Sequence, residues 1–207
     1  KSWDRPMNLS ADAPRVAKNP AAQQQNLSQS GQATYNNPVA IADRQTGAVH
    51  FLFCAEYARC FYMKSTDDGK TFSKPVDITH AFEELRPQYN WHVLATGPGH
   101  GIQLENGRLI VPAWLSTGTG GHAHRPSCVT SLYSDDHGKT WHCGEIVANN
   151  PDPLKNPSET AAVQLADGRV MFNMRNESSI HRRGVAYSPN GAADWTKPVF
   201  DKQLFEP

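Results

Sequence analysis

The sequence predicts an all-β protein, a β-propeller of four-stranded antiparallel sheets, and three observations predict it. From Pro38 onward short apolar runs alternate with turn residues, and no 3.6-residue period extends over the length of a helix. Hairpin dipeptides recur at Thr46-Gly47, Asn106-Gly107 and Asp167-Gly168, at spacings of 60 and 61 residues. A second motif, Ser-x-Asp-x-Gly-x-Thr-aromatic, follows each of the first two hairpins. Repetition of such a unit is typical of propeller blades.

Residues 1–37 are expected to hold the end of one blade and a long surface loop. The stretch from Ala21 to Gly31 is polar and lacks aromatic residues. Trp3-Asp4-Arg5-Pro6 matches Phe72-Ser73-Lys74-Pro75 and Trp195-Thr196-Lys197-Pro198, which both begin at the aromatic residue that ends a turn motif or its remnant. We therefore expect the chain to start in the middle of a repeat.

Three blades are expected after this loop, at residues 38–85, 86–150 and 151–207. Each would contain a hairpin, a third strand, the turn motif and a fourth strand. Closed propellers typically have four to eight blades, so three blades and a fragment predict an intact protein that is longer at both ends.

The turn motif is expected to have a structural role. Its Asp can cap backbone N–H groups, its Gly can take the left-handed conformation, and its aromatic residue can tuck beneath the loop. A degraded third copy lies at residues 188–195. The residues of the two complete copies are Ser65, Asp67, Gly69 and Phe72, and Ser134, Asp136, Gly138 and Trp141.

The hairpin around Asp167-Gly168 carries the candidate site at its open end. Glu159 lies eight residues before Asp167 and Arg175 seven residues after Gly168, which returns an acid and a guanidinium to nearly the same level. Whether they share a face depends on the strand register. A two-residue loop would pair position 160 with position 175 and place Glu159 on the opposite face.

Composition excludes several classes of partner. The 207 residues are 38% apolar, enough for a core, and 20 basic residues balance 20 acidic ones, which argues against a nucleic-acid partner. We find no long uncharged apolar run for a membrane span and no signal peptide at Lys1. The oligomeric state is not indicated.

No cofactor or metal is expected. The glycine-rich run Thr96–Gly101 is not followed by a helix pattern or by the Lys-Ser/Thr of a phosphate-binding loop. His122 and His124 have no carboxylate or cysteine at ligand spacing. The four cysteines match no zinc motif, and Cys54 and Cys60 are either bridged or buried as free thiols.

Taken together, these motifs resemble the sialidase (neuraminidase) superfamily. The turn motifs are similar to its Asp-boxes, and Thr96–Leu109 resembles the second-hairpin motif of bacterial-type sialidases. The segment Pro157–Asn176 resembles the one that carries two active-site residues sixteen positions apart. The ordered combination covers nearly all of the chain from Pro38 to Pro198.

This resemblance implies a retaining exo-α-sialidase on a six-bladed propeller, acting on sialylated glycoconjugates without a cofactor. Arg175 would match the second arginine of a triad that holds the substrate carboxylate, and Glu159 would match the base that deprotonates a tyrosine nucleophile. In the family the other two arginines, the acid/base aspartate and the tyrosine precede or follow these positions. We therefore expect this chain to be a central fragment with an incomplete site. The substrate class favours a secreted or periplasmic protein.

Three further residues are weaker candidates for substrate binding. His100 either lines the substrate pocket or is a hydrogen-bonded structural histidine. Tyr89 and Trp91 either stack on the aglycone side of a sugar or act as packing anchors. Two rival functions also stay open: a non-catalytic glycan-binding propeller, and another exo-glycosidase on the same fold.

Overall fold

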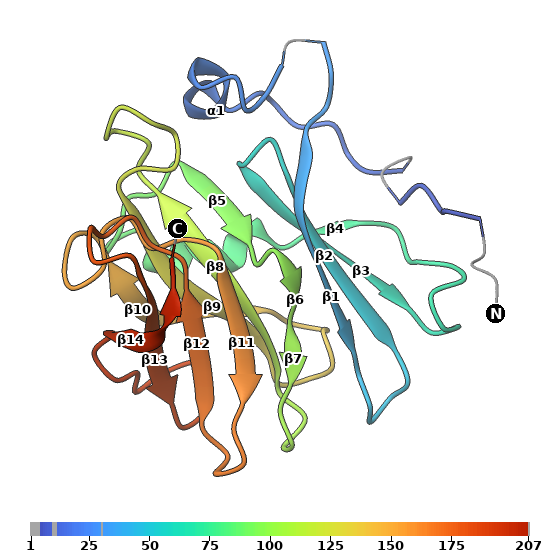
Figure 1. The fold of residues 1–207 in the computed structure, drawn as a ribbon. Helices are drawn as coiled ribbons and strands as arrows, with labels where there is room; N and C mark the ends of the chain where they lie inside the picture. The colour runs from blue at the N-terminus through green and yellow to red at the C-terminus, as the bar shows by residue number, and fades with distance from the viewer. Residues whose placement is uncertain (1–4, 10–11, 30, 207) are drawn as a thin grey trace.

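The computed structural model describes residues 5–9, 12–29 and 31–206, and nearly all of its regular structure is β-strand (Figure 1). Trp3 and Asp4, half of the expected repeat tail, lie outside the described residues. The strands are, in chain order, β1 (Tyr35–Ala42), β2 (Val49–Ala55), β3 (Arg59–Ser65), β4 (Val76–Asp77), β5 (Val93–Thr96), β6 (Gly99–His100), β7 (Ile102–Gln103), β8 (Leu109–Ser116), β9 (Ser127–Ser134), β10 (His142–Asn149), β11 (Thr160–Gln164), β12 (Val170–Met174), β13 (Arg182–Ser188) and β14 (Val199–Phe205).

The strands form three sheets, as predicted. Sheet A has the order β4-β3-β2-β1-β6, sheet B the order β10-β9-β8-β5 with β7 also on β8, and sheet C the order β11-β12-β13-β14. One pairing was not expected: β6 leaves its neighbours in the chain and pairs in parallel with β1, with Val39 opposite Gly99. This pairing joins the start of the second expected blade to sheet A.

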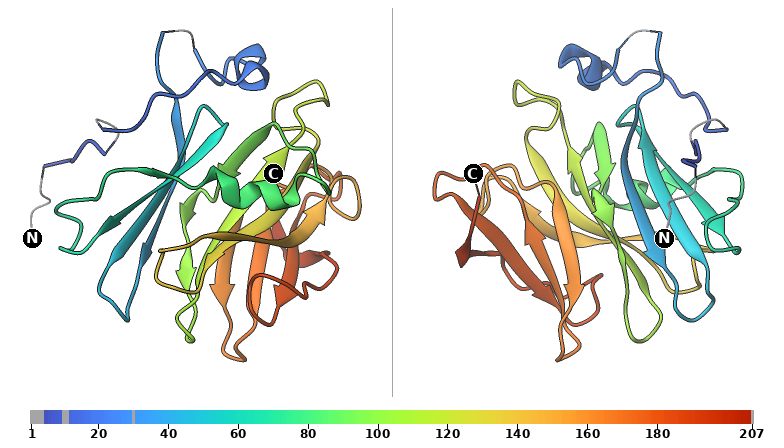
Figure 2. Two further views of the ribbon diagram at one scale, coloured as in Figure 1. Left: turned by 180° about the vertical axis from the view of Figure 1, so that it is seen from behind. Right: turned by 45° about the vertical axis from the view of Figure 1, so that its right-hand side comes forward.

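The sheets are arranged like successive blades of a propeller. Their first strands face a common side, so that β1, β6, β7 and β11 occupy the middle of Figure 1 while β4, β10 and β14 lie toward the periphery. The turned views of Figure 2 show the same side-by-side order of the three sheets. The strand ends nearest the middle of the molecule therefore come from all three sheets.

Two buried apolar clusters fill the spaces between the sheets. One lies between sheets A and B and includes Leu52 and Val111, and the other lies between sheets B and C and includes Trp114 and Phe172. All eight residues of β8 are buried. A strand covered on both faces reads as a continuous apolar run, which explains the sequence Leu-Ile-Val-Pro-Ala-Trp-Leu of this strand.

Both complete turn motifs adopt one hydrogen-bonded geometry. In the first, Asp67 accepts hydrogen bonds from the Thr71 N–H (2.9 Å) and hydroxyl (2.7 Å), and Ser65 Oγ accepts one from Gly69 (2.9 Å). These bonds lower the pKa of Asp67 to about 2. The second motif repeats every one of these contacts at the same distances, with Ser134, Asp136, Gly138 and Thr140.

The degraded third copy keeps the same type of loop. Asn190 takes the place of the Asp, and its side-chain oxygen accepts from the N–H groups of Ala192 (2.8 Å) and Ala193 (2.9 Å). Trp195 packs on Phe172, with ring centroids 4.4 Å apart. An amide oxygen thus replaces the carboxylate as the cap.

A buried polar cluster connects sheet A to the turn motif of sheet B. Asp43 Oδ2 lies 2.7 Å from Nδ1 of His137 and 3.4 Å from Nε2 of His50. On its other side, His50 Nδ1 lies 2.7 Å from the hydroxyl of Tyr62. Burial opposes ionisation of Asp43, but hydrogen bonds from Thr46 and His137, among others, outweigh it and hold its pKa well below the ordinary value. We call Asp43, His50, Tyr62 and His137 the inter-sheet cluster.

The predicted N-terminal loop contains one short helix, α1 (Pro20–Gln24). Asn19 caps it by accepting from the Ala21 N–H (3.1 Å), and Pro20 suits the first helical position. The Asn19 amide also donates to the carbonyls of Tyr57 (3.2 Å) and His92 (2.9 Å). These bonds hold α1 across sheets A and B. No helix among the described residues is long and apolar enough to cross a membrane.

All four cysteines are free thiols. Cys54 and Cys60 lie directly opposite each other on β2 and β3, and both are fully buried. Of the two states left open by the sequence, this structure has the buried free thiols.

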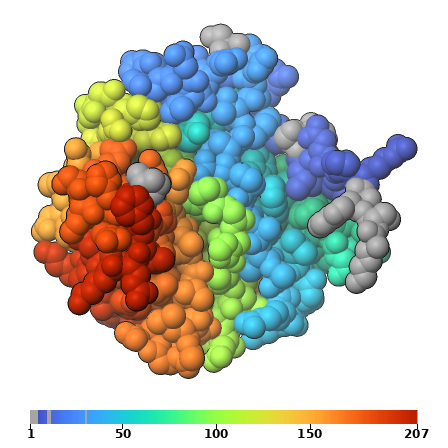
Figure 3. Space-filling model, in the orientation of Figure 1, coloured from blue at the N-terminus to red at the C-terminus, as the bar shows by residue number. Residues whose placement is uncertain are grey.

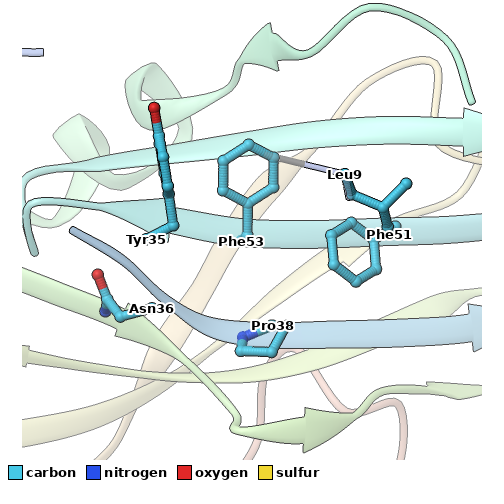
Figure 4. A pocket seen from close by; sticks show the side chains of 6 residues that line it. All are labelled: Leu9, Tyr35, Asn36, Pro38, Phe51 and Phe53. Atoms are coloured by element: carbon cyan, nitrogen blue, oxygen red, sulfur yellow. The ribbon is translucent and has the colours of Figure 1, made fainter. Parts of the chain in front are cut away.

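The outward face of sheet A carries an aromatic cluster with a small apolar hollow of about 150 Å³ (Figure 4). Phe51 and Phe53 form its floor, with ring centroids 6.1 Å apart, and Tyr35 stands edge-on to Phe53. Leu9 from the N-terminal segment also lines it. Neither Glu159 nor Arg175 lines this hollow, so it is separate from the candidate site.

Candidate active site

Glu159 and Arg175 lie opposite each other at the open end of the β11–β12 hairpin. The register pairs Thr160 with Met174, and the Arg175 N–H donates to the Glu159 carbonyl (2.9 Å), which extends the ladder by one pair. The side chains therefore share a face of sheet C, and Nε of Arg175 lies 3.9 Å from Oε2 of Glu159. Both side chains are about half exposed.

The length of the hairpin loop determines this pairing. The loop has three residues, Ala166 to Gly168, closed by hydrogen bonds from Leu165 N–H to the Arg169 carbonyl (2.8 Å) and from Gly168 N–H to the Leu165 carbonyl (2.9 Å). Gly168 has φ +86°, the conformation that glycine takes in a three-residue hairpin loop. The two-residue loop, which would have separated the two charged side chains, does not form.

The segment before β11 is held on both sides. Ser158 donates its N–H to the Arg175 carbonyl (3.0 Å), and its hydroxyl oxygen accepts from Nη1 of Arg175 (3.2 Å). The Thr160 N–H donates to the carbonyl of Gly97 (3.3 Å) in the segment between β5 and β6. The glycine-rich run that resembles the second-hairpin motif thus lies directly beside the start of β11.

Glu206, which no motif in the sequence singles out, follows β14 directly and lies close to Arg175. Its side chain is 8% exposed, and its carboxylate lies 2.7 Å from Nη1 of Arg183 and 3.9 Å from Nε of Arg175. Arg183 also donates to the side chain (2.7 Å) and carbonyl (3.2 Å) of Asn173. Arg183 and Arg175 thus belong to one charged network centred on Glu206.

His124 and Tyr57 extend the site toward sheets A and B. Their ring centroids are 5.5 Å apart, and His124 stands edge-on to Trp114 at 4.7 Å. Burial, together with the neighbouring His122 and Arg175, lowers the pKa of His124 to about 4. Burial raises the pKa of Tyr57, and the nearby Glu159 carboxylate adds to this effect.

Two buried polar atoms face this region without a partner among the described residues, His124 Nε2 and Trp114 Nε1. A buried polar atom left unpaired is costly, and such atoms gather where a ligand or water binds. His122 accepts the His124 N–H through Nδ1 (3.1 Å). Within the described ranges no three His, Cys, Asp or Glu side chains are placed to hold a metal ion.

The weaker candidates lie in different places. His100 is exposed on β6, at the inner edge of sheet A. Tyr89 and Trp91 are in the core between sheets A and B, 8% and 4% exposed. The Tyr89 hydroxyl donates to the Pro126 carbonyl (2.7 Å), and Trp91 Nε1 donates to the Phe82 carbonyl (3.1 Å). Neither ring presents a face to a sugar in this structure.

Comparison with known proteins shows which family this chain resembles. The family model described as "BNR repeat-like domain" matches residues 3–202. Sialidase-3 of Rattus norvegicus is 28% identical over 195 residues, which are 83% of this chain and 44% of the rat protein. The sialidase of Micromonospora viridifaciens is 28% identical over 89% of this chain and 30% of its own length. The chain thus spans less than half the length of these curated relatives.

Solved structures agree at the level of the fold. The Hadza microbial sialidase Hz136 superposes with a TM-score of 0.65 at 22% identity, over 91% of this chain and 37% of that one. The intramolecular trans-sialidase from Ruminococcus gnavus gives 0.66 at 16% identity, over 91% of this chain and 58% of that one. The sheets of this chain are therefore arranged as in sialidase propellers.

Proposed function

This chain belongs to the family of BNR repeat-like domains, and from that premise we propose that it carries part of the active site of a retaining exo-α-sialidase. One observation supports the proposal above all: Glu159 and Arg175, sixteen residues apart, face each other on one side of the β11–β12 hairpin. The substrate would be a glycoconjugate with a terminal sialic acid, the class on which proteins named sialidase act.

Arg175 is suited to hold the carboxylate of the substrate. Its guanidinium is planar and permanently charged, and it can donate two parallel hydrogen bonds to a carboxylate. Both carboxylates near Nε, those of Glu159 and Glu206, are 3.9 Å away, beyond ordinary hydrogen-bond length. The neighbouring carboxylates therefore position the guanidinium but leave its Nε–H free to donate a hydrogen bond to a substrate.

Glu159 is suited to act as a general base. Sialic acid bears a carboxylate on its anomeric carbon, so an anionic nucleophile would approach against like charge. A neutral tyrosine avoids this repulsion, and sialidases are known to use one. Because the reference pKa of tyrosine is about 10, the hydroxyl needs a partnered carboxylate to accept its proton.

The proposed reaction has two steps. Glu159 takes the tyrosine proton as the phenol oxygen bonds to the anomeric carbon, and the glycosidic bond breaks with protonation of its oxygen by an acid. Water then attacks the same carbon and gives up a proton to the conjugate base of that acid, the carbon–tyrosine bond breaks, and the tyrosine recovers its proton from Glu159. The two displacements retain the anomeric configuration. We place the tyrosine, the acid and two further arginines outside these 207 residues.

The experiment compares variants of the full-length protein on a fluorogenic sialoside. Arg175→Ala should raise KM strongly, because a charged interaction with the substrate is lost, and Glu159→Gln should lower kcat at least 100-fold, because the nucleophile loses its base. Arg169→Ala, which breaks the exposed Arg169–Asp167 pair at the other end of the same hairpin, is the matched control. Undiminished turnover by Glu159→Gln would refute the assignment.

A further inference from the structure

A polar pocket of about 500 Å³ opens next to the candidate active site, between loops of sheets B and C. Its walls come from the β8–β9 connection (Gly120, Arg125 and Pro126), the β10–β11 connection (Asn150, Lys155 and Asn156) and Glu177 after β12. In Figure 3 the corresponding yellow-green and orange surfaces border one another at the upper left. We call this the loop pocket.

The loop pocket is built around a charge pair that is neutralised within the protein. Nε and Nη2 of Arg125 both donate to the Glu177 carboxylate (3.1 and 2.9 Å to Oε1). The second oxygen of Glu177 accepts from the side-chain amide of Asn156 (2.7 Å). Burial raises the pKa of Glu177, but the hydrogen bonds from Arg125 and Asn156 outweigh it and leave the pKa lowered. The carboxylate is therefore ionised and fixed.

Backbone contacts hold the walls in place before any ligand arrives. Asn156 is 7% exposed, has φ +46°, and donates its N–H to the side chain of Asn150 (2.9 Å). The Glu177 N–H donates to the Lys155 carbonyl (2.7 Å), and the Lys155 N–H donates to the Ser178 hydroxyl (2.9 Å). A site with this many fixed polar groups loses little conformational entropy on binding.

The lining of the loop pocket is joined along the chain to the segments that carry Glu159 and Arg175. Pro157 and Ser158 lead directly from its wall into Glu159, and Ser158 contacts Arg175 as described. Glu177, which lines the loop pocket, follows Arg175 by two residues, and the charge of Arg175 contributes to lowering its pKa. A substrate held by Arg175 would therefore extend its next group toward this pocket.

From this geometry, and resting on the proposed function, we infer that the loop pocket is a subsite for the neutral sugar to which the sialic acid is linked. The charges of Arg125 and Glu177 satisfy each other, so of the lining residues only Lys155 adds net charge. What remains for a ligand is Nη1 of Arg125, the Asn150 amide and the Lys155 ammonium at the mouth. Guanidinium and amide groups of this kind recognise hydroxyl groups, and the walls carry no aromatic ring for an apolar aglycone.

The test uses the full-length protein and two substrates that differ beyond the sialic acid: sialyllactose, and a sialoside with a small fluorogenic aglycone. Arg125→Lys keeps a charge beside Glu177 but loses the planar fork, and Lys155→Ala removes the ammonium at the mouth. Each should lower kcat/KM for sialyllactose about tenfold, as expected for one hydrogen bond to a charged group, and change that for the small sialoside less than twofold. Lys139→Ala, exposed on the turn motif of sheet B, is the control.

The outcomes separate this proposal from the proposed function. Equal losses on both substrates, or no loss on either, would overturn the subsite. Lactose binding is measured separately by saturation-transfer NMR: wild-type protein should show a signal that both variants weaken. If the protein cleaves neither substrate yet binds lactose in this way, the subsite stands and the proposed reaction is wrong. If lactose gives no signal and neither substrate is cleaved, both fail.

Discussion

Glu159 and Arg175 face each other across β11 and β12 with 3.9 Å between Nε and the nearer carboxylate oxygen. This separation is longer than a hydrogen bond, and both side chains are about half exposed, so the pair contributes little to stability. The same looseness leaves each group free for another partner. A carboxylate and a guanidinium are thus held close together without neutralising each other.

Glu206→Gln should weaken substrate binding more than turnover. The substitution removes the negative charge that lies 2.7 Å from Arg183 and 3.9 Å from Arg175, so Arg175 loses part of its alignment. We expect KM for a fluorogenic sialoside to rise about 3- to 10-fold, with kcat changed less than threefold, because no reacting atom is touched. Steady-state kinetics of the full-length protein measure both values.

The exposed Glu105→Gln substitution is the matched control for Glu206→Gln. Thermal unfolding of each variant shows whether the fold is kept. An unchanged KM in a folded Glu206→Gln protein would mean that Glu206 does not position Arg175.

The equivalent glycines of the two turn motifs should respond differently to alanine. Gly138 and Gly69 have φ +79° and +81°, so either substitution strains the backbone by about 1–2 kcal/mol. A β-carbon at Gly69 would meet open space, whereas one at Gly138 would collide with the Tyr62 hydroxyl and lie 2.8 Å from Nδ1 of His50. Overpacking adds about 1–3 kcal/mol.

Urea unfolding should therefore show a larger loss for Gly138→Ala than for Gly69→Ala. The difference is the contribution of the contact with the inter-sheet cluster, since the strain in φ is common to both variants. Equal losses in the two variants would show that the turn of sheet B does not press against His50 and Tyr62.

Acid should weaken the protein through His50. Burial lowers the pKa of His50 in the folded protein below the ordinary value of 6.5. At a pH between the folded and the unfolded pKa, the unfolded chain therefore binds a proton that the folded chain does not. The contribution of His50 is complete above about pH 6.5 and is lost as the pH falls below it. His124, whose pKa is lowered to about 4, adds a loss of the same sign.

The measurement is the free energy of unfolding from pH 7.5 to 5. We expect the free energy of unfolding of His50→Gln to change less steeply with pH than that of the wild type, whatever the stability of the variant at neutral pH. His80→Gln, on the exposed side of the 3₁₀ helix Thr79–Leu85, serves as the control. An identical slope in wild type and His50→Gln would contradict the argument.

The sheets and turn motifs could be predicted because their signals are local. A Ser, an Asp and a Gly at fixed offsets specify the turn around Asp136 by contacts within a few residues, and alternating apolar runs specify the strands. The register of the β11–β12 hairpin could not be predicted. Asp167-Gly168 suits a two-residue loop as well as a three-residue loop with Gly168 in the left-handed position.

Tertiary contacts account for the rest. The short side chains of β11 give a weak hydrophobic pattern, and Val163 is left 42% exposed, so burial alone does not choose the register. The bond from Thr160 to Gly97, 63 positions earlier, favours the observed one. Glu206 and His124 are likewise brought to the site by pairing between distant segments, which no short motif encodes. Tyr89 and Trp91 read as candidates because an aromatic residue in a loop has the same sequence signature whether it is exposed or packed.

The two ends of the three sheets are built differently. One end carries the turn motifs and the hairpin loops, while the end that holds Glu159 is formed by unlike connections at residues 117–126, 150–159 and 175–181. The repeated turns keep the scaffold uniform, and the other connections can change in length or sequence without disturbing the strand ladders. For protein engineering, selectivity can therefore be altered by exchanging loops at one end, while the opposite end is left untouched to preserve folding.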